Sequence, residues 1–191
     1  MTNMSDLRVV KTLDAIHTAF EELACEKGPG SLTVTELCGR ARINKKTFYR
    51  YYASIGALLA EYQARLATEY VERTSHLRIP ADTAELTRQF IPFSCEKGEE
   101  SPLYERITAG TELAPLREQM IDRVLESRRV SPEGFAGLGS DEASVVIAYL
   151  QQVGGIVYRQ WVVDGKRLAP ERLADLAAEL ATHGLAGVLD P

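Results

Sequence analysis

The chain has 191 residues, of which 45% are hydrophobic and 26% charged, and its formal net charge is −5. This length and composition are typical of a globular protein with one large or two small domains and a substantial core. No apolar run approaches the ~20 residues that a membrane-spanning helix needs, and no apolar signal core is visible, so we expect a cytoplasmic protein without a membrane partner.

Cysteine and histidine are too sparse and too dispersed to indicate a disulfide framework or a metal site. Cys25, Cys38 and Cys95 are an odd number without a CxxC pair, which fits a reducing compartment. No GxSxG, phosphate-binding loop or HExxH motif occurs. We therefore expect no catalytic site, no metal and no cofactor.

Apolar residues recur every three or four positions in nearly every segment, which predicts an all-α fold. The first helix is expected from about Asp6 to Lys27, where Val9, Leu13, Ile16, Phe20 and Leu23 form one apolar stripe. The Gly28-Pro29-Gly30 run should end this helix.

The stretch 33–52, TVTELCGRARINKKTFYRYY, predicts a helix-turn-helix. Thr33 and Glu36 form a capping box before a short helix, and Asn44 is a good N-cap for a second helix over residues 45–52. On that helix Phe48 and Tyr52 should point inward. Lys45, Lys46, Thr47, Tyr49 and Arg50 should then face outward, which is the chemistry of a helix that reads the major groove.

Positive charge is concentrated on this two-helix stretch of an acidic chain. Residues 34–52 hold five Lys or Arg and one acid, Glu36. A cluster of cations on one short helix is more often a solvated surface than a DNA contact, but this concentration favours a phosphate-facing patch.

The run LTVTELCGRARINKKTFYRYYASIGALLAEY resembles the DNA-binding region of TetR-type transcriptional repressors, specifically over about residues 8–62. Three positions depart from the family pattern: Arg42 and Lys46 stand where glycine is common, and Ile55 replaces a phosphate-binding lysine. The resemblance implies an N-terminal three-helix head over residues 1–54 and a ligand-binding and dimerisation body over residues 55–191. It implies DNA contacts by Val34, Arg42, Asn44, Lys45, Lys46, Thr47, Tyr49, Arg50 and Tyr51.

The following segments predict the helices of the body. A helix from Ile55 to about His76 would connect the head to the body and, by the resemblance, transmit ligand-driven movement. The next should run from Asp82 to about Cys95, with Pro92 kinking or ending it and a turn over 96–102. Shorter helices are expected to Thr108 and from Pro115 to about Arg129, with a loop over 131–140.

Two apolar helices close the chain, one over about residues 141–164 and one starting at Pro170. The first is apolar around most of its circumference, and Gly154-Gly155 in its middle suggests a close helix crossing or room for a ligand. The pair resembles the dimerisation helices of some TetR-type regulators and predicts a homodimer. The expected interface residues are Val146, Leu150, Val153, Val157, Leu173, Leu176 and Leu180.

The body should hold any effector, in a cavity lined by apolar and aromatic side chains. The candidates are Phe90, Phe93, Tyr104, Met120, Tyr149, Tyr158 and Trp161, although aromatic residues at helical spacing are more often core. The sequence thus predicts a homodimeric regulator that binds palindromic operator DNA and is released by a small, largely apolar ligand, and the resemblance to TetR-type repressors implies that it represses. The alternative is a helical interaction protein that has lost DNA binding, because Ile55 removes one expected phosphate contact.

Overall fold

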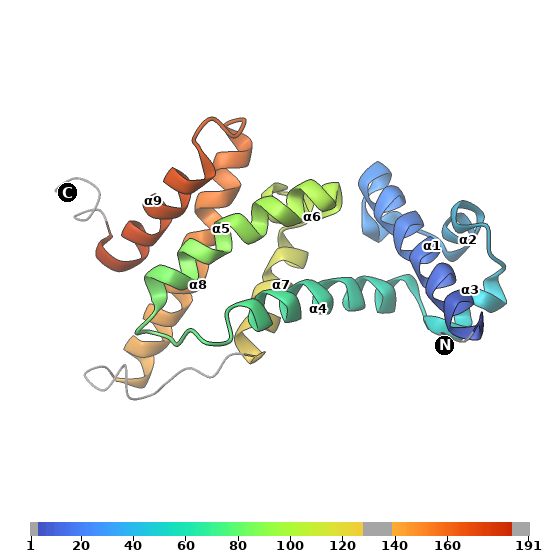
Figure 1. Cartoon of the computed structure of the whole chain (residues 1–191), viewed down its shortest axis with the longest axis horizontal. Coiled ribbons are helices and arrows are strands. Elements are labelled where there is room, and N and C mark those ends of the chain that lie inside the picture. Colours follow the sequence, from blue (N-terminus) through green and yellow to red (C-terminus); the bar gives the residue numbers. More distant parts are fainter. Residues whose placement is uncertain (1–3, 128–138, 185–191) are drawn as a thin grey trace. The chain divides into compact units, whose positions relative to one another are not determined.

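A computed structural model describes residues 4–127 and 139–184, and these residues are 81% helical, as the sequence predicts. Figure 1 shows the order of the elements along the chain. They are α1 (Met4–Lys27), the short 3₁₀ helix η1 (Pro29–Ser31), α2 (Val34–Ala41), α3 (Lys45–Tyr51), α4 (Ile55–Arg73), α5 (Thr83–Glu100), α6 (Pro102–Ala109), α7 (Ala114–Ser127), α8 (Ser140–Val163) and α9 (Pro170–His183). No described helix is both long and apolar enough to cross a membrane.

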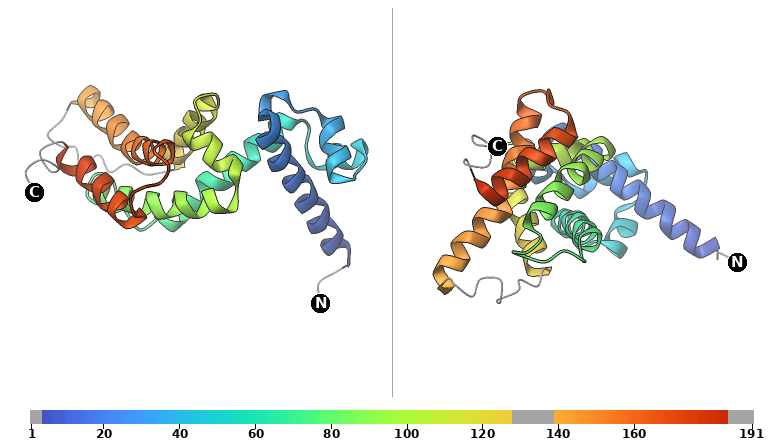
Figure 2. Two further views of the ribbon diagram at one scale, coloured as in Figure 1. Left: turned by 90° about the horizontal axis from the view of Figure 1, so that it is seen from above. Right: turned by 60° about the vertical axis from the view of Figure 1, so that its left-hand side comes forward.

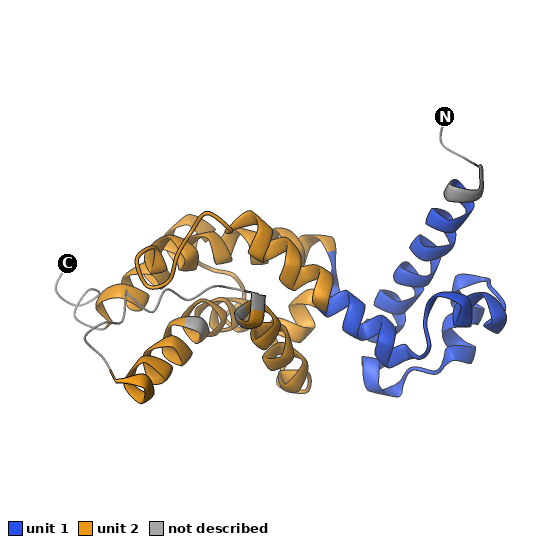
Figure 3. Cartoon of the chain, turned by 90° about the horizontal axis from the view of Figure 1, so that it is seen from below, with its two compact units in different colours: residues 1–63, 101–103 blue, residues 64–100, 104–191 orange. Residues whose placement is uncertain are grey.

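The chain divides into two compact units, drawn in separate colours in Figure 3. Unit 1 comprises residues 1–63 together with Ser101–Leu103, where α5 ends and α6 begins. Unit 2 comprises residues 64–100 and 104–191. The division falls within α4, so the first nine residues of that helix, 55–63, belong with the head.

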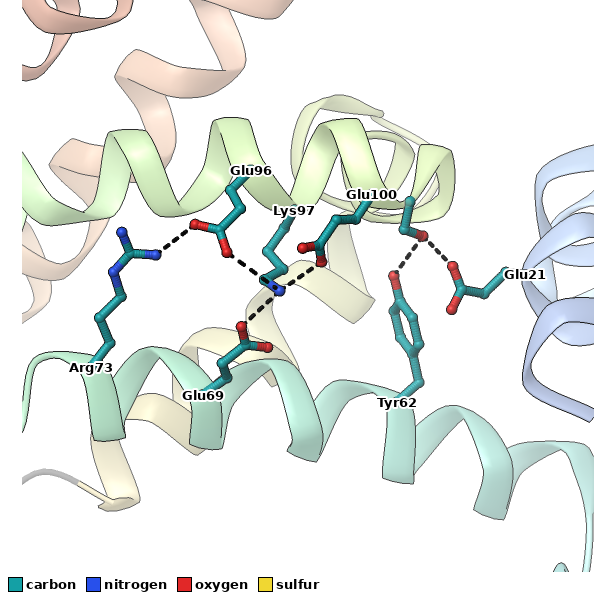
Figure 4. Close-up of polar contacts among 8 residues, drawn as sticks. Glu21, Tyr62, Glu69, Arg73, Glu96, Lys97 and Glu100 are labelled. Carbon is teal, nitrogen blue, oxygen red and sulfur yellow. Dashed lines mark hydrogen bonds and ion pairs between the residues drawn. The ribbon is translucent and has the colours of Figure 1, made fainter. Parts of the chain in front are cut away.

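Unit 1 is built on a core that α1 supplies to the shorter helices. Ile16, Phe20 and Leu23 are buried on the apolar stripe of α1, and Leu37 of α2 and Phe48 of α3 are fully buried. The Tyr62 ring of α4 lies 6.0 Å from that of Phe20. The Ser101 hydroxyl donates to Glu21 of α1 and lies 3.2 Å from the Tyr62 hydroxyl; Glu21 and Tyr62 are labelled in Figure 4.

Unit 2 packs α5, α8 and α9 against one another, and two views in Figure 2 show α9 in red beside α5 in green and α8 in orange. The helix α9 begins with Pro170 at its first turn, as predicted, and buries Leu173, Ala177 and Ala181. The small residues of α9 let the neighbouring helices approach closely. The predicted loop over 131–140 lies largely outside the described residues.

The prediction for α5 was wrong at its C-terminal end. The helix continues past Cys95 to Glu100, through Pro92 and over most of the predicted turn. Pro92 is exposed, while Ile91 and Phe93 beside it are buried, so packing on the inner face outweighs the one backbone hydrogen bond that proline removes. Gly98 does not mark a turn. A Cβ atom there would lie 2.8 Å from the Tyr158 hydroxyl, so glycine permits α5 and α8 to pack closely.

Candidate nucleic-acid interface and ligand cavity

The first helix of the helix-turn-helix begins with the predicted capping box. Thr33 Oγ1 accepts from the Glu36 amide at 3.3 Å, and Glu36 Oε2 accepts from the Thr33 amide at 3.1 Å. Lys27 also donates to Glu36. The hydrogen bond from Lys27 and, to a smaller extent, those from Thr33 lower the pKa of Glu36 from 4.5 to about 2. Its carboxylate therefore stays ionised and stabilises the start of α2.

The turn between α2 and α3 depends on Arg42, which has a left-handed backbone with φ 54° and ψ 42°. Its amide donates to the carbonyl groups of Cys38 and Gly39 and so ends α2. The sequence predicted a break between the two helices but not the left-handed conformation of Arg42. A residue with a side chain is disfavoured in this region, so the turn carries backbone strain at Arg42.

The second helix of the motif, α3, is oriented by a cap at one end and by two buried rings. Asn44 Oδ1 accepts from the Thr47 amide at 2.7 Å, as expected of an N-cap. Phe48 is fully buried and Tyr52 is 5% exposed. Because these rings fix the inner face, the predicted reading face of α3 lies outward.

The outward face of α3 carries positive charge without a counter-charge from the described residues. Lys45, Lys46, Arg50 and the turn residue Arg42 are exposed, and none pairs with a described carboxylate. Tyr49 is 56% exposed between them. Four cations and a phenol on one short surface form a site that phosphate groups would neutralise.

Three of the remaining four predicted DNA-binding residues are less exposed. Val34, Thr47 and Tyr51 are half-buried, and the Arg50 guanidinium lies 5.9 Å from the centre of the Tyr51 ring. The Thr47 hydroxyl donates to Asn44 Oδ1 at 3.0 Å, so it is available mainly as an acceptor, and the exposed Asn44 uses that oxygen as a cap.

Arg40, one of the five cations of the motif, has an internal role. Its guanidinium donates to Glu22 and Glu26 of α1 at 2.9 Å, with two bonds to Glu26. These bonds, first to Glu26 and then to Glu22, raise the pKa of Arg40 further above its usual range. Arg40 therefore joins α2 to α1, and the charge that faces outward comes from the other four cations.

Unit 2 contains a cavity of about 140 Å³, against the ~10–15 Å³ that one water molecule needs. Its lining comes from α4, α5, α6, α7 and α8 and is almost wholly apolar, with Arg117 its one charged residue among those described. The lining residues are Leu66, Ala67, Tyr70, Ile79, Thr83, Leu86, Thr87, Phe90, Phe93, Tyr104, Thr108, Arg117, Met120, Ile121, Val124, Ile147, Leu150, Gly154 and Gly155.

The cavity brings together four of the seven predicted ligand residues: Phe90, Phe93, Tyr104 and Met120. The other three do not line it. Tyr158 is buried and donates to the Ser94 carbonyl, the exposed Tyr149 donates to the Leu180 carbonyl, and the Trp161 indole donates to the Leu168 carbonyl. Their polar atoms are used in packing unit 2.

The cavity also depends on the glycine pair of α8. A Cβ atom at Gly154 would lie 2.9 Å from Cδ1 of Phe90, so this glycine allows α8 to approach α5. A Cβ atom at Gly155 would meet nothing within 4 Å. The sequence suggested either a close crossing or room for a ligand, and the two glycines divide these roles between them.

Most predicted dimer residues are used within the protomer. Val153 and Leu173 are buried, Leu150 lines the cavity, and Val146 packs against Ile79 and Leu86. Val157, Leu176 and Leu180 are half-buried. The large apolar residues that α8 exposes are different ones, Val145, Tyr149, Ile156 and Val163, between 50% and 70% exposed.

A buried cation joins α4 to α5 beside the cavity. Lys97 is 7% exposed, and its ammonium lies 2.7 Å from Glu69 and 2.6 Å from Glu100. Figure 4 shows these contacts with the Arg73–Glu96 pair next to them. Burial opposes the charge of Lys97, but Glu100 and Glu69 outweigh that effect and its pKa is raised. The cluster fixes the middle of α4 against the helix that carries Phe93.

Comparison with known proteins gives a family match for the head of the chain. Residues 16–62 match the family model described as bacterial regulatory proteins, tetR family. The matched segment runs from α1 to α4 and includes the whole helix-turn-helix. The members of that family are DNA-binding transcriptional regulators, and the match includes α3 with its exposed cations. No curated protein matches the sequence.

Solved structures extend the similarity in fold over 90% of the chain. The regulator FadR of Bacillus subtilis, in complex with stearoyl-CoA, has a TM-score of 0.66 and 15% identity over 90% of this chain and 98% of its own. The fatty acid degradation regulator FadR of Bacillus halodurans has a TM-score of 0.57 and 18% identity, over 90% and 95% of the two chains. A Streptomyces coelicolor transcriptional regulator, SCO4942, has a TM-score of 0.57 and 21% identity, over 90% and 97%.

Proposed function

We propose that the chain is a cytoplasmic, homodimeric repressor that binds palindromic operator DNA through α3 and is released by a largely apolar ligand. The observation that carries the DNA part is the exposed cluster of Arg42, Lys45, Lys46 and Arg50, which lacks carboxylate partners among the described residues. Lys45, Lys46 and Thr47 are suited to base edges or nearby phosphates, and Tyr49 and Arg50 to phosphates.

The ligand part is supported by the cavity and by what a relative binds. The cavity walls are apolar, as an alkyl chain would require, and FadR of Bacillus subtilis was solved with stearoyl-CoA. We therefore propose a ligand with a long alkyl or acyl chain. The helix α4 contributes Leu66, Ala67 and Tyr70 to the cavity lining and Leu58 and Tyr62 to the core of the head. One continuous helix thus takes part in both units, which suits the transmission of a ligand response.

The dimer is proposed to form through the exposed apolar stripe of α8. Val145, Tyr149, Ile156 and Val163 follow one another at intervals of four, seven and seven residues, so they share one side of the helix. A helix-turn-helix monomer contacts few base pairs, and a symmetric dimer doubles the site. Ile156→Glu should yield a monomer in sedimentation velocity, whereas Ser144→Glu, at an exposed position of α8 about 120° around the helix from Ile156, should leave the dimer intact.

The test of the proposed function is fluorescence anisotropy with DNA from beside the protein's own coding region, over a salt series. The Lys45→Ala/Arg50→Ala variant should lose affinity, and its slope of log affinity against log salt should fall by up to about 1.8 if each cation meets one phosphate. Arg167→Ala/Arg172→Ala removes two exposed cations of unit 2 and serves as the matched control.

The ligand arm adds dodecanoyl-CoA to the preformed complex and measures release of the DNA. Absence of binding to any duplex at low salt would refute the regulator and favour a helical interaction protein. Binding that is equally weakened in the control variant would show a diffuse charge effect, and α3 would not be the reading helix.

A further inference from the structure

Two arginine side chains meet at the C-terminal end of α6. Arg117 of α7 donates from Nη1 to the carbonyl groups of Thr108, at 3.4 Å, and Gly110, at 3.1 Å. Arg159 of α8 donates from Nε to the carbonyl of Ala109, at 3.3 Å. Three consecutive carbonyl groups therefore accept from two guanidinium groups that come from different helices.

The positive charge at this point exceeds what the helix end can balance. The C-terminus of a helix carries roughly −0.5 of an elementary charge, against two full positive charges. Neither Arg117 nor Arg159 pairs with a described carboxylate, whereas Arg106 of α6 has Glu112 at 3.7 Å. Each guanidinium has five N–H donors, so several remain after the bonds to the carbonyl groups.

The remaining polar groups of the cavity wall have little to offer a ligand. The Tyr70 hydroxyl donates to the Leu86 carbonyl, and the Tyr104 hydroxyl is hydrogen-bonded to Ser94. Each lining threonine donates to a backbone carbonyl, Thr83 to Pro80, Thr87 to Thr83 and Thr108 to Tyr104. Arg117 is thus the donor-rich group on an apolar wall.

We propose that Arg117, supported by Arg159 at the same helix end, binds the anionic head group of the ligand while the cavity holds its apolar chain. Guanidinium groups bind carboxylate and phosphate oxygens in pairs, and a purely apolar ligand would cover the Arg117 charge without compensating it. This inference rests on the proposed function and specifies its ligand as an anionic amphiphile. The anion is either a carboxylate or the phosphate groups of a CoA thioester.

The experiment measures binding of three dodecyl probes by isothermal titration calorimetry: dodecanoate, dodecanoyl-CoA and the neutral 1-dodecanol. The wild type should bind at least one anionic probe tenfold or more tightly than dodecanol. Arg117→Gln should abolish that preference and leave dodecanol affinity unchanged, because glutamine can still donate to the α6 carbonyl groups. Arg159→Gln should reduce the preference, and Arg106→Gln, on α6 but outside the cavity, should keep it.

The probes distinguish the two sources of the anion. A preference for dodecanoate indicates a carboxylate site, whereas a preference for dodecanoyl-CoA with displacement by CoA alone indicates a phosphate site. If the wild type binds dodecanol as tightly as both anions, or Arg117→Gln keeps the preference, the inference is refuted while the apolar ligand of the proposed function stands. If no probe binds, the proposed ligand response fails and the inference with it.

A variant that keeps the positive charge distinguishes loss of the anion site from misfolding. Should Arg117→Gln lose dodecanol binding as well, Arg117→Lys decides: a retained preference for the anion supports a charge-based site, and equal binding of all three probes refutes it.

Discussion

Replacing Arg42 with glycine should make the head more stable and weaken its binding to DNA. The Arg42 backbone has φ 54° and ψ 42°, where an L-residue with a side chain is disfavoured by about 1–2 kcal/mol. Glycine avoids this cost, although it loses more conformational entropy on folding, by about 0.5–1 kcal/mol. The expected net gain in stability is roughly 0.5–1 kcal/mol. Because 1 kcal/mol shifts Tm by about 2–4 °C in a chain of this size, Tm should rise by about 1–4 °C.

The same change removes an exposed cation of the proposed DNA interface. If Arg42 meets one phosphate, the slope of log affinity against log salt should fall by about 0.9 in Arg42→Gly. Anisotropy between 50 and 200 mM salt measures this slope, and thermal melting of the free protein measures stability. Arg42→Lys should keep both the charge and the strain, so it should resemble the wild type in both assays.

Two results would contradict this reasoning. A melting temperature that is unchanged or lower in Arg42→Gly would mean that the left-handed turn stores no relievable strain. An unchanged salt slope together with higher stability would mean that the Arg42 side chain does not reach the DNA. Arg42→Asn separates the two effects further, because asparagine tolerates the left-handed region and carries no charge.

Four further substitutions test the body and the start of α2. Gly154→Ala should lower the stability of the protein by about 1–3 kcal/mol in thermal melts, because the new Cβ would lie 2.9 Å from Phe90. Gly155→Ala should raise the stability by up to about 1 kcal/mol, because its Cβ would meet nothing within 4 Å. Equal effects of the two substitutions would contradict the different roles assigned to the two glycines. Lys97→Met should lower the free energy of unfolding in urea by about 1–2 kcal/mol. The loss should be smaller than for a fully buried ion pair because the carboxylate partners are half exposed. An unchanged free energy of unfolding would mean that the cluster does not stabilise the packing of α4 on α5. Glu36 has a folded pKa of about 2, below its ordinary 4.5, so its contribution to stability is present above about pH 4.5 and lost toward pH 2. The stability difference between the wild type and Glu36→Gln should shrink over that interval, and a constant difference would rule out the ionised carboxylate as its cause.

The head could be predicted from the sequence because its signals are local. A capping box at Thr33, an N-cap at Asn44 and an i, i+4 aromatic pair each involve residues within four positions of one another, and the structure contains all three. The internal role of Arg40 could not be predicted in the same way. Its partners lie 14 and 18 residues away on α1, and no local pattern distinguishes a cation that binds another helix from one that faces DNA.

The end of α5 was mispredicted because two residues that usually break helices have tertiary roles. Pro92 faces solvent, where its missing donor is least costly, and Gly98 accommodates the Tyr158 hydroxyl of α8. The buried Lys97 between them has acidic neighbours in the sequence, so it looked like part of a solvated turn. Its contact with Glu69, 28 positions earlier, is visible only after α4 and α5 are packed.

The exposed side of α8 and the candidate ligand site could not be predicted for the same reason, because both depend on tertiary packing. The helix α8 is apolar around most of its circumference, so its sequence cannot separate the side that packs on α5 and α9 from the side left to solvent. Once α5 and α9 cover their side, Val153 becomes core, and Val145, Ile156 and Val163 remain exposed. Arg117 gave no sequence signal, because one cation on a short helix is ordinary. It becomes distinctive only because it lines an apolar cavity in which the hydroxyl groups of the described lining residues already have backbone or side-chain partners. A charge in such an apolar wall is what the binding of an anionic amphiphile would require.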